Sequence, residues 1–455
     1  MNGQGMHSVT SRLLAMVSML LVAGCSGADS TAPRGGSTAL QSTATSAAHR
    51  TASTSAGKPT PASPAAYRPQ QFHGSQTAFY TPPDPLPKVP HGTLLRYERS
   101  PMKVSGATVW KVMYASTALT GKRIAVTGMV IVPNGAAPAG GWKLLSVAHG
   151  TTGIADDCAP SRTDLPRPAG QKLPYTVQIG SVNFDRMPQA GYLKSGYVMA
   201  MTDYEGLGTP GVHPYLVGPS EARGVLDAAR AARQLPHTPV RKTFVIWGYS
   251  QGGHAAAWAN DLAASWTPDL HLVGTVAGGP VSEMNLVANT LATTTMEPSL
   301  LFMIVAGYAA AYPQLHPSDV LTPTGIQVMK RFEASCNAFR TAARGKPLST
   351  LVKPGFTKNT TWQTLLGRSN PAQYGEKAPK SPLLILHSAD DEVVPVFLSK
   401  VMFDRMCTIG WTVDRRVYHN GKGHVAEVIN AMDDGLPWLN ARMAGEKARS
   451  TCPKK

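Results

Sequence analysis

The pentapeptide Gly248-Tyr249-Ser250-Gln251-Gly252 constrains the fold of this chain more than any other feature. It directly follows residues 243–247, which have the pattern of a buried strand, and opens an alanine-rich helical stretch that runs to Ser265. A turn this sharp between a strand and a helix requires glycine on both sides of the serine. It also raises the hydroxyl and points the helix N-terminus at it. We therefore predict that Ser250 is a nucleophile at the carboxyl end of a buried strand.

The rest of the chain alternates between short apolar runs and helical patterns. Two β-rich runs, 109–116 and 124–132, are separated by Gly121-Lys122, which suits an antiparallel pair. A helical pattern extends from Ser220 to near Pro236. The other runs are of the kind buried between helices, at 144–148, 197–202, 243–247, 270–277 and 382–386. With 455 residues and 43% hydrophobic content, this alternation predicts an α/β-hydrolase fold, with a mostly parallel, doubly wound sheet.

A serine hydroxyl becomes a strong nucleophile only when a base removes its proton. The usual base is a histidine that a carboxylate orients, in the chain order serine, acid, histidine. An acidic loop, residues 388–395, follows the strand that ends at His387, and Asp391 in this loop is the predicted acid. Two histidines follow it. We favour His424, because it lies in a glycine-containing loop just before a helical run; His419, after the strand 413–418, is the alternative.

The charge that develops on a substrate carbonyl oxygen needs two backbone N–H donors. The amide of Gln251, the residue after the predicted nucleophile, is the first. We expect the second from the loop after the strand 144–148, which reads His-Gly-Thr-Thr-Gly. Thr152 is the preferred donor in this loop, and Thr151 is the alternative.

The N-terminal residues 1–25 predict an export signal, with Arg12 ahead of an apolar run at 13–23. This run is much shorter than the ~20 residues that span a bilayer. The small residues before Cys25 are typical of a bacterial lipobox, so we predict that Cys25 carries a lipid anchor in the cell envelope. An ordinary signal peptide and secretion are the alternative. Residues 26–79, rich in Ser, Thr, Ala, Gly and Pro, predict a disordered tether, and the folded domain is expected from about Tyr80.

Four cysteines remain after Cys25, an even number that suits two disulfides in an oxidising compartment, with three possible pairings: Cys158, Cys336, Cys407 and Cys452. No Cys-x-x-Cys clamp occurs, and we predict no metal site. Residues 206–211 read G-x-G-x-x-G, but Pro210 prevents the helix that would hold a pyrophosphate, so we expect no cofactor. The formal net charge is +16. Lys and Arg are scattered, which argues against a nucleic-acid partner.

Four motifs together carry a family resemblance. They are Gly-Tyr-Ser-Gln-Gly-Gly at 248–253, Asp-Tyr-Glu-Gly at 203–206, Asp-Cys-Ala-Pro-Ser at 157–161 and Asp-Glu-Val-Val-Pro at 391–395. From about Pro82 to its C-terminal region, the chain resembles the secretory lipase family typified by yeast lipase A. The resemblance implies that Ser250, Asp391 and His424 form a triad and that Thr152 is the upstream oxyanion residue. The family has aspartate at the position of Thr152, and the chain departs from it there.

The resemblance also implies a domain organisation and disulfide pairings. The hydrolase core would comprise residues 80–280 and 381–455, and residues 281–380 would form a helical cap over the acyl pocket. Cys158 would pair with Cys336, and Cys407 with Cys452.

The predicted activity is hydrolysis of carboxylic esters, small-molecule or lipid, through an acyl-enzyme intermediate. Only residues 425–455 follow His424, which leaves little room for a C-terminal flap over the site, so we expect a preference for short to medium acyl esters. A serine peptidase or acyltransferase with the same triad is the first alternative, because a fold and a triad do not fix the leaving group. A noncatalytic envelope lipoprotein is the second.

Overall fold

The computed structural model describes residues 67–165, 189–293, 298–340, 342–372 and 378–454. The predicted export signal, Cys25 and residues 26–66 lie outside this part of the chain. Residues 67–79, assigned to the tether by composition, belong to the fold. Strand β1 (Gln70–Gln71) pairs with β2 (Leu94–Arg99), and Phe79 is buried. Aromatic side chains supply the apolar surface that the upstream segment lacks, so the folded domain begins before Tyr80.

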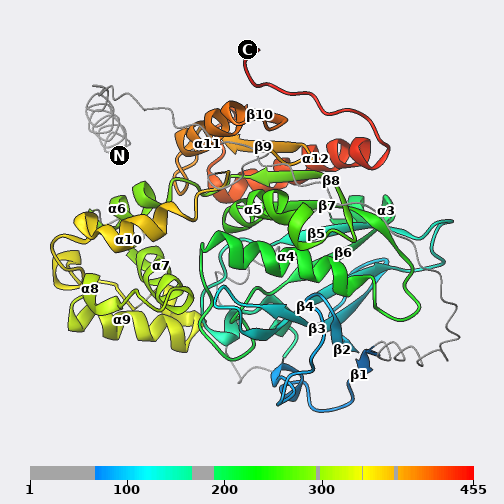
Figure 1. The fold of residues 1–455 in the computed structure, drawn as a ribbon, viewed down its shortest axis with the longest axis horizontal. Helices are drawn as coiled ribbons and strands as arrows, with labels where there is room; N and C mark the ends of the chain where they lie inside the picture. The colour runs from blue at the N-terminus through cyan, green and yellow to red at the C-terminus, as the bar shows by residue number, and fades with distance from the viewer. Residues whose placement is uncertain (1–66, 166–188, 294–297, 341, 373–377, 455) are drawn as a thin grey trace, which may run out of the picture. The chain divides into compact units, whose positions relative to one another are not determined.

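The described residues form one ten-stranded sheet, in the order β1-β2-β3-β4-β6-β5-β7-β8-β9-β10 (Figure 1). The neighbouring strands β2, β3, β4 and β6 are antiparallel, and the strands from β6 to β10 along the sheet are parallel. The predicted hairpin is therefore confirmed, as is the mostly parallel sheet. The remaining strands are β3 (Ala107–Thr117), β4 (Arg123–Pro133), β5 (Trp142–Ala148), β6 (Tyr197–Thr202), β7 (Val240–Tyr249), β8 (His271–Gly278), β9 (Leu383–Ser388) and β10 (Val413–Tyr418).

Helices cover both faces of the parallel region, because its strands are apolar on both sides. Leu144 and Ile246 pack in one cluster with α4 (Gly218–Ala232) and α5 (Gln251–Trp266). Their neighbours Leu145 and Val245 face the other way and pack with α3 (Gln189–Lys194) and α12 (His424–Met443). Helix α11 (Val396–Thr408) covers β9 and β10. Helix α4 begins at Gly218 and not at Ser220, because Pro219 suits a first helical turn.

The chain between β8 and β9 forms a group of helices that lies beside the sheet (Figure 1). Its members pack around their own apolar cluster, which includes Phe302, Phe332 and Trp362. Tyr215, Leu216 and other residues of the loops at the sheet belong to the same cluster, so the group is continuous with the core. The helices are α6 (Met284–Thr293), α7 (Pro298–Ala311), α8 (Pro317–Val320), α9 (Pro323–Ala334) and α10 (Thr360–Gly367).

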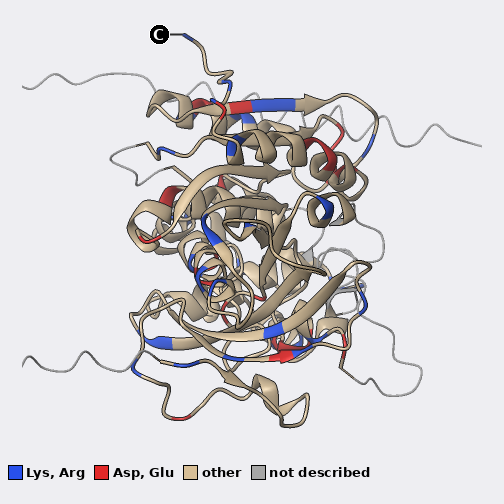
Figure 2. Ribbon diagram, turned by 90° about the vertical axis from the view of Figure 1, so that its right-hand side faces the viewer, with Lys and Arg blue, Asp and Glu red and all other residues tan. Residues whose placement is uncertain are grey.

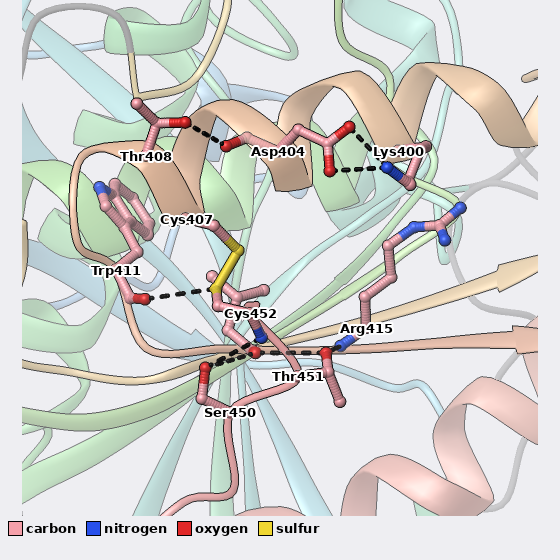
Figure 3. The surroundings of a disulfide bond; sticks show 10 residues. Lys400, Asp404, Cys407, Thr408, Trp411, Arg415, Ser450, Thr451 and Cys452 are labelled. Atoms are coloured by element: carbon pink, nitrogen blue, oxygen red, sulfur yellow. Dashed lines mark hydrogen bonds and ion pairs between the residues drawn. A yellow bond between two sulfur atoms is a disulfide. The ribbon is translucent and has the colours of Figure 1, made fainter. Parts of the chain in front are cut away.

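Two disulfides join distant parts of the chain, in the pairings that the resemblance implies. Cys158, in the loop after β5, pairs with Cys336 in the segment after α9. Cys407, at the end of α11, pairs with Cys452 near the C-terminus (Figure 3).

The C-terminal segment is hydrogen-bonded along β10, next to the second disulfide. The amide of Thr451 donates to the carbonyl of Val413 at 2.8 Å, and the amide of Arg415 donates to the Thr451 hydroxyl at 2.9 Å (Figure 3). The carbonyl of Thr412 accepts from Leu383 at the start of β9. Because backbone groups alternate along a strand, the tail occupies the edge of β10 that faces away from β9.

Charged residues are distributed over many elements. Figure 2 shows Lys and Arg on several strands and helices, with acidic residues among them. No helix in the described part of the chain combines the length and apolar character needed to cross a bilayer.

Candidate active site

Ser250 lies at the junction between β7 and α5, where the sequence places it. Its backbone has φ 60° and ψ −120°, a conformation that few L-residues adopt. The Ser250 amide donates to the carbonyl of Gly278 at 2.9 Å, so the turn is fixed to the end of β8. The side chain is half-buried and therefore partly accessible.

The glycines around Ser250 are required by close backbone approaches. A Cβ atom at Gly248 would collide with the carbonyl oxygen of Gly252. A Cβ atom at Gly252 would collide with the carbonyl oxygen of Ala148, at the end of β5. These collisions involve backbone atoms that cannot move aside, so the G-x-S-x-G pattern is a steric requirement of this turn.

Asp391 and His424 come together at the carboxyl ends of β9 and β10. Nδ1 of His424 lies 2.6 Å from Oδ2 of Asp391, and both side chains are buried or nearly so. Oδ1 of Asp391 accepts from the amides of Val393 and Val394, at 3.0 and 2.6 Å. His419 follows the end of β10 and is exposed. Of the two candidate histidines, the one that hydrogen-bonds Asp391 is therefore His424.

His387 is a second histidine next to Asp391, and no motif in the sequence predicts a role for it. Its Nε2 lies 3.2 Å from Oδ2 of Asp391 and 2.8 Å from the carbonyl of Val394. Because both neighbours are acceptors, Nε2 carries a proton. Burial by itself would raise the pKa of Asp391. Other interactions outweigh this effect of burial and hold the pKa of Asp391 well below its usual range. They are the hydrogen bonds from His387, His424 and the Val394 amide, and the nearby charge of His424.

The imidazole of His424 lies near the turn that carries Ser250. A Cβ atom at Gly279 would be 3.3 Å from Cε1 of His424. Gly279 follows Gly278, whose carbonyl binds the Ser250 amide. Nδ1 faces Asp391, so Nε2 is the ring nitrogen that does not contact the acid.

Two further side chains hold the backbone of His424. Oε2 of Glu392 accepts from its amide at 2.9 Å, and the hydroxyl of Tyr249 donates to its carbonyl at 2.7 Å. A Cβ atom at Gly423 would displace the Glu392 carboxylate from this position. The sequence motifs contain Glu392 and Tyr249, but motif position alone does not reveal these contacts.

The loop after β5 lies against the start of α5. Thr152 is fully buried, and Thr151 bonds through Oγ1 to the hydroxyl of Tyr215 at 2.7 Å. Gly153 follows at φ 131°, where a Cβ atom would collide with Sγ of Cys158. The disulfide to Cys336 therefore fixes the course of the loop that contains both candidate donors.

Gln251 is buried, with its side chain turned toward polar groups of α4 and the loop after β6. Its Nε2 lies 2.8 Å from Oε1 of Glu221 and 2.8 Å from Nε2 of His213. Burial lowers the pKa of His213, so the ring is neutral and accepts from Gln251. The sequence assigned no role to Glu221 or His213.

One group of possible metal ligands occurs among the described residues, formed by Asp157, Cys158 and Cys336. Both sulfurs belong to a disulfide and cannot act as thiolate ligands.

Comparisons with known proteins identify the family. The sequence model of the secretory lipases matches residues 172–451. The chain belongs to the secretory lipase family. It is therefore a lipase or esterase, an enzyme that hydrolyses carboxylic esters.

Relatives of this secretory lipase agree with the assignment. Lipase 4 of Candida albicans is 26% identical over 404 residues, covering 83% of each chain. The secreted triacylglycerol lipase LIP7 of Malassezia globosa is 25% identical over 394 residues, covering 83% of this chain and 81% of its own.

Solved structures agree with the fold. The closed state of Candida antarctica lipase A superposes with a TM-score of 0.71 at 22% identity, over 82% of this chain and 87% of its own. The rice cell wall degrading esterase LipA of Xanthomonas oryzae gives a TM-score of 0.58 at 22% identity, over 78% and 98%. The predicted α/β-hydrolase fold is confirmed.

Proposed function

We propose that this secretory lipase is a serine hydrolase that cleaves carboxylic esters through an acyl-enzyme on Ser250, with His424 as general base and Asp391 as its orienting acid. The observation that supports this most is the bond between His424 and Asp391, with the ring of His424 next to Gly279 near the turn that carries Ser250. The amides of Gln251 and Thr152 are the proposed oxyanion donors.

The proposed reaction has two steps. His424 Nε2 takes the proton of the Ser250 hydroxyl as Oγ attacks the ester carbonyl carbon, and the two amides stabilise the oxyanion. The alcohol then leaves with the proton from His424, and the acyl group stays on Ser250. In the second step His424 removes a proton from water, which attacks the acyl-enzyme, and the acid is released as Ser250 regains its proton. Asp391 stays ionised throughout, because its pKa is held low, and stabilises the imidazolium.

We propose residues 281–380 as a cap over the acyl pocket, and short to medium acyl esters or triacylglycerols as substrates. The apolar cluster that joins this segment to Tyr215 and Leu216 supports an apolar acyl site. The described residues after α12 run to β10, where Thr451 and Cys452 are held, and so do not cover the site as a flap. Activity that rises steadily toward long-chain, insoluble esters would contradict this preference.

We also propose export of the chain and lipidation of Cys25, which the sequence supports through the apolar run and the small residues before the cysteine. Mass spectrometry of the mature N-terminus tests this. A diacylated Cys25 is expected, and an unmodified N-terminus downstream of it would contradict it.

The decisive test is fluorophosphonate labelling followed by peptide mapping. We expect the label on Ser250, and Ser250→Ala should lose both labelling and hydrolysis of p-nitrophenyl butyrate. An active Ser250→Ala protein would refute the proposal. Assays of esters against matched peptide amides then separate an esterase from a peptidase.

A further inference from the structure

A buried carboxylate in α4 contacts Gln251, the residue after the proposed nucleophile and the first residue of α5. Glu221 is fully buried. Its Oε1 accepts from Nε2 of Gln251 at 2.8 Å and from the amide of Leu216 at 2.9 Å. Its Oε2 lies 3.0 Å from Nδ1 of His254. One side chain thus joins the residue after Ser250, the loop after β6 and the second turn of α5.

The hydrogen-bond partners of His254 determine how charge is balanced here. Its Nε2 lies 2.8 Å from the carbonyl of Ser369, which can only accept, so Nε2 carries a proton. A single proton lies between Nδ1 and Oε2 of Glu221, whichever atom bears it. The pair is therefore neutral as a whole, which makes a buried carboxylate tolerable at this position.

The same contacts fix the orientation of Gln251. If its side-chain amide were reversed, its oxygen would face the oxygen of Glu221, so Nε2 must point toward the carboxylate. Nε2 then donates to both Glu221 and His213, and Oε1 of Gln251 is buried without a hydrogen-bond partner among the described residues. An unsatisfied buried acceptor is costly. The Gln251 side chain is thus held through its NH2 group, by Glu221 and His213, and not through its oxygen.

A second costly feature depends on Glu221. Leu216 has φ 57°, an unfavourable value for a leucine, and its amide is bound by Oε1 of Glu221. Its carbonyl accepts from the hydroxyl of Tyr308, in α7, at 3.0 Å. Strained residues persist only where their surroundings hold them, and they gather at functional sites. Glu221 thus binds both the strained Leu216 and Gln251, the residue that follows the strained Ser250.

We propose that Glu221 is a positioning residue of the esterase reaction, which orients Gln251 and thereby the Gln251 amide that donates to the oxyanion. This inference rests on the proposed function, because it needs Ser250 as nucleophile and the Gln251 amide as donor. Glu221 itself does not contact the substrate. It acts through its bond to the side chain of Gln251, with His254 as the partner that keeps the site neutral.

Two substitutions separate the orienting role of Glu221 from the space that its side chain fills. Glu221→Met keeps the length of the side chain but removes every acceptor. Glu221→Gln keeps an oxygen for Leu216 and Gln251, and its NH2 group donates to Nδ1 of His254, so it is the conservative variant. Glu205→Met is the matched control, because Glu205 is a half-buried carboxylate that bonds the Ser220 hydroxyl rather than Gln251.

The measurement is kcat and KM for p-nitrophenyl butyrate, per active site counted by the endpoint of fluorophosphonate labelling. Counting sites removes any loss caused by misfolded protein. Removal of one oxyanion donor costs about 10²–10³-fold in kcat, and misorientation should cost less. We expect kcat to fall about 10- to 100-fold in Glu221→Met with KM within about threefold. Glu221→Gln and Glu205→Met should stay within about threefold of wild type.

A double-mutant cycle tests whether Glu221 acts through Gln251. Gln251→Leu removes the link while leaving Glu221 and His254 paired, and it should lower kcat as Glu221→Met does, with no further loss in the double variant. If Glu221→Met does not fold, Gln251→Leu decides alone. Unchanged kcat per site in the variants of Glu221 or Gln251, or equal losses in Glu221→Gln and Glu221→Met, would overturn the inference. A wild-type protein not labelled at Ser250 would instead refute the proposed function.

Discussion

Ser250 and His424 form the two sides of the proposed reaction centre and are held by different means. The turn at Ser250 is fixed by backbone contacts that leave no space for a Cβ atom at Gly248 or Gly252. His424 is held by hydrogen bonds to side chains, with Nδ1 donating to Asp391 and its amide donating to Glu392. A steric constraint fails all at once, whereas a hydrogen-bonded one can be weakened in steps. The two sides should therefore respond differently to substitution and to pH.

The largest effect is expected from His424→Ala. Without the proposed base, kcat for p-nitrophenyl butyrate should fall by about 10³-fold or more, because no group would remain to take the proton of the Ser250 hydroxyl. His419→Ala is the matched control, and its kcat should stay within about twofold, since His419 is exposed and outside the Asp391 pair. The reverse result would overturn the choice between the two histidines.

Gly252→Ala should disrupt the sterically fixed turn at Ser250. The added methyl group would collide with the Ala148 carbonyl, and a shift of about 1 Å at a reacting group costs about 10²-fold in kcat. Gly421→Ala, in the loop before His424, has open space around the added atom and should stay within about threefold, despite φ 72° at this position. Similar losses in both variants would contradict a difference between the two sides.

Acid should destabilise the Ser250 side before the His424 side. His149 is fully buried in the loop after β5, next to Gly252. Burial is the main cause that lowers the pKa of His149 to about 4, so the folded state favours the neutral ring. Its contribution to stability is fully present above pH 6.5 and is lost as pH falls toward 4. The loss is roughly 3 kcal/mol in the free energy of unfolding. The pKa of Asp391 is instead lowered below 3.8, so its contribution is lost only below that pH.

Denaturant unfolding between pH 7 and pH 4 checks this prediction. His149→Phe should flatten the decline relative to wild type, whereas His419→Ala should follow the wild-type curve. The buried His213 titrates in both proteins, so the difference between the curves isolates His149. An unchanged slope in His149→Phe would show that its burial does not drive the decline.

The smallest effect is expected at Glu392. Glu392→Ala removes the acceptor for the His424 amide, and kcat should fall about three- to tenfold, since one hydrogen bond contributes about 1 kcal/mol. Glu392→Gln retains an oxygen and should lie nearer to wild type. A loss in Glu392→Ala as large as that of His424→Ala would mean that Glu392 does more than hold the backbone.

The steric side was also the easier one to predict. Gly248, Ser250 and Gly252 lie within five consecutive residues, and the rule that requires them is local, so strand, turn and helix could be placed together. Asp391 and His424 were also preferred from the sequence, with His419 as the alternative, and only the structure shows which of the two histidines bonds Asp391. The contact between Glu221 and His254 could not be predicted, because its partners lie on separate helices and neither belongs to a local motif. The start of the fold was placed too late, because scattered aromatic residues such as Phe72 and Phe79 are outweighed by composition in that segment.

The C-terminal residues along β10 have a further consequence. A strand at the margin of a sheet presents unpaired N–H and C=O groups and can recruit a strand from another molecule. Thr451 bonds to Val413 and Arg415 on the outer edge of β10, and the Cys407–Cys452 disulfide keeps it there (Figure 3). Where disulfides persist, the bond thus keeps this edge of the sheet covered. Reduction is expected to expose this edge and to favour aggregation of chains whose sheet is otherwise intact.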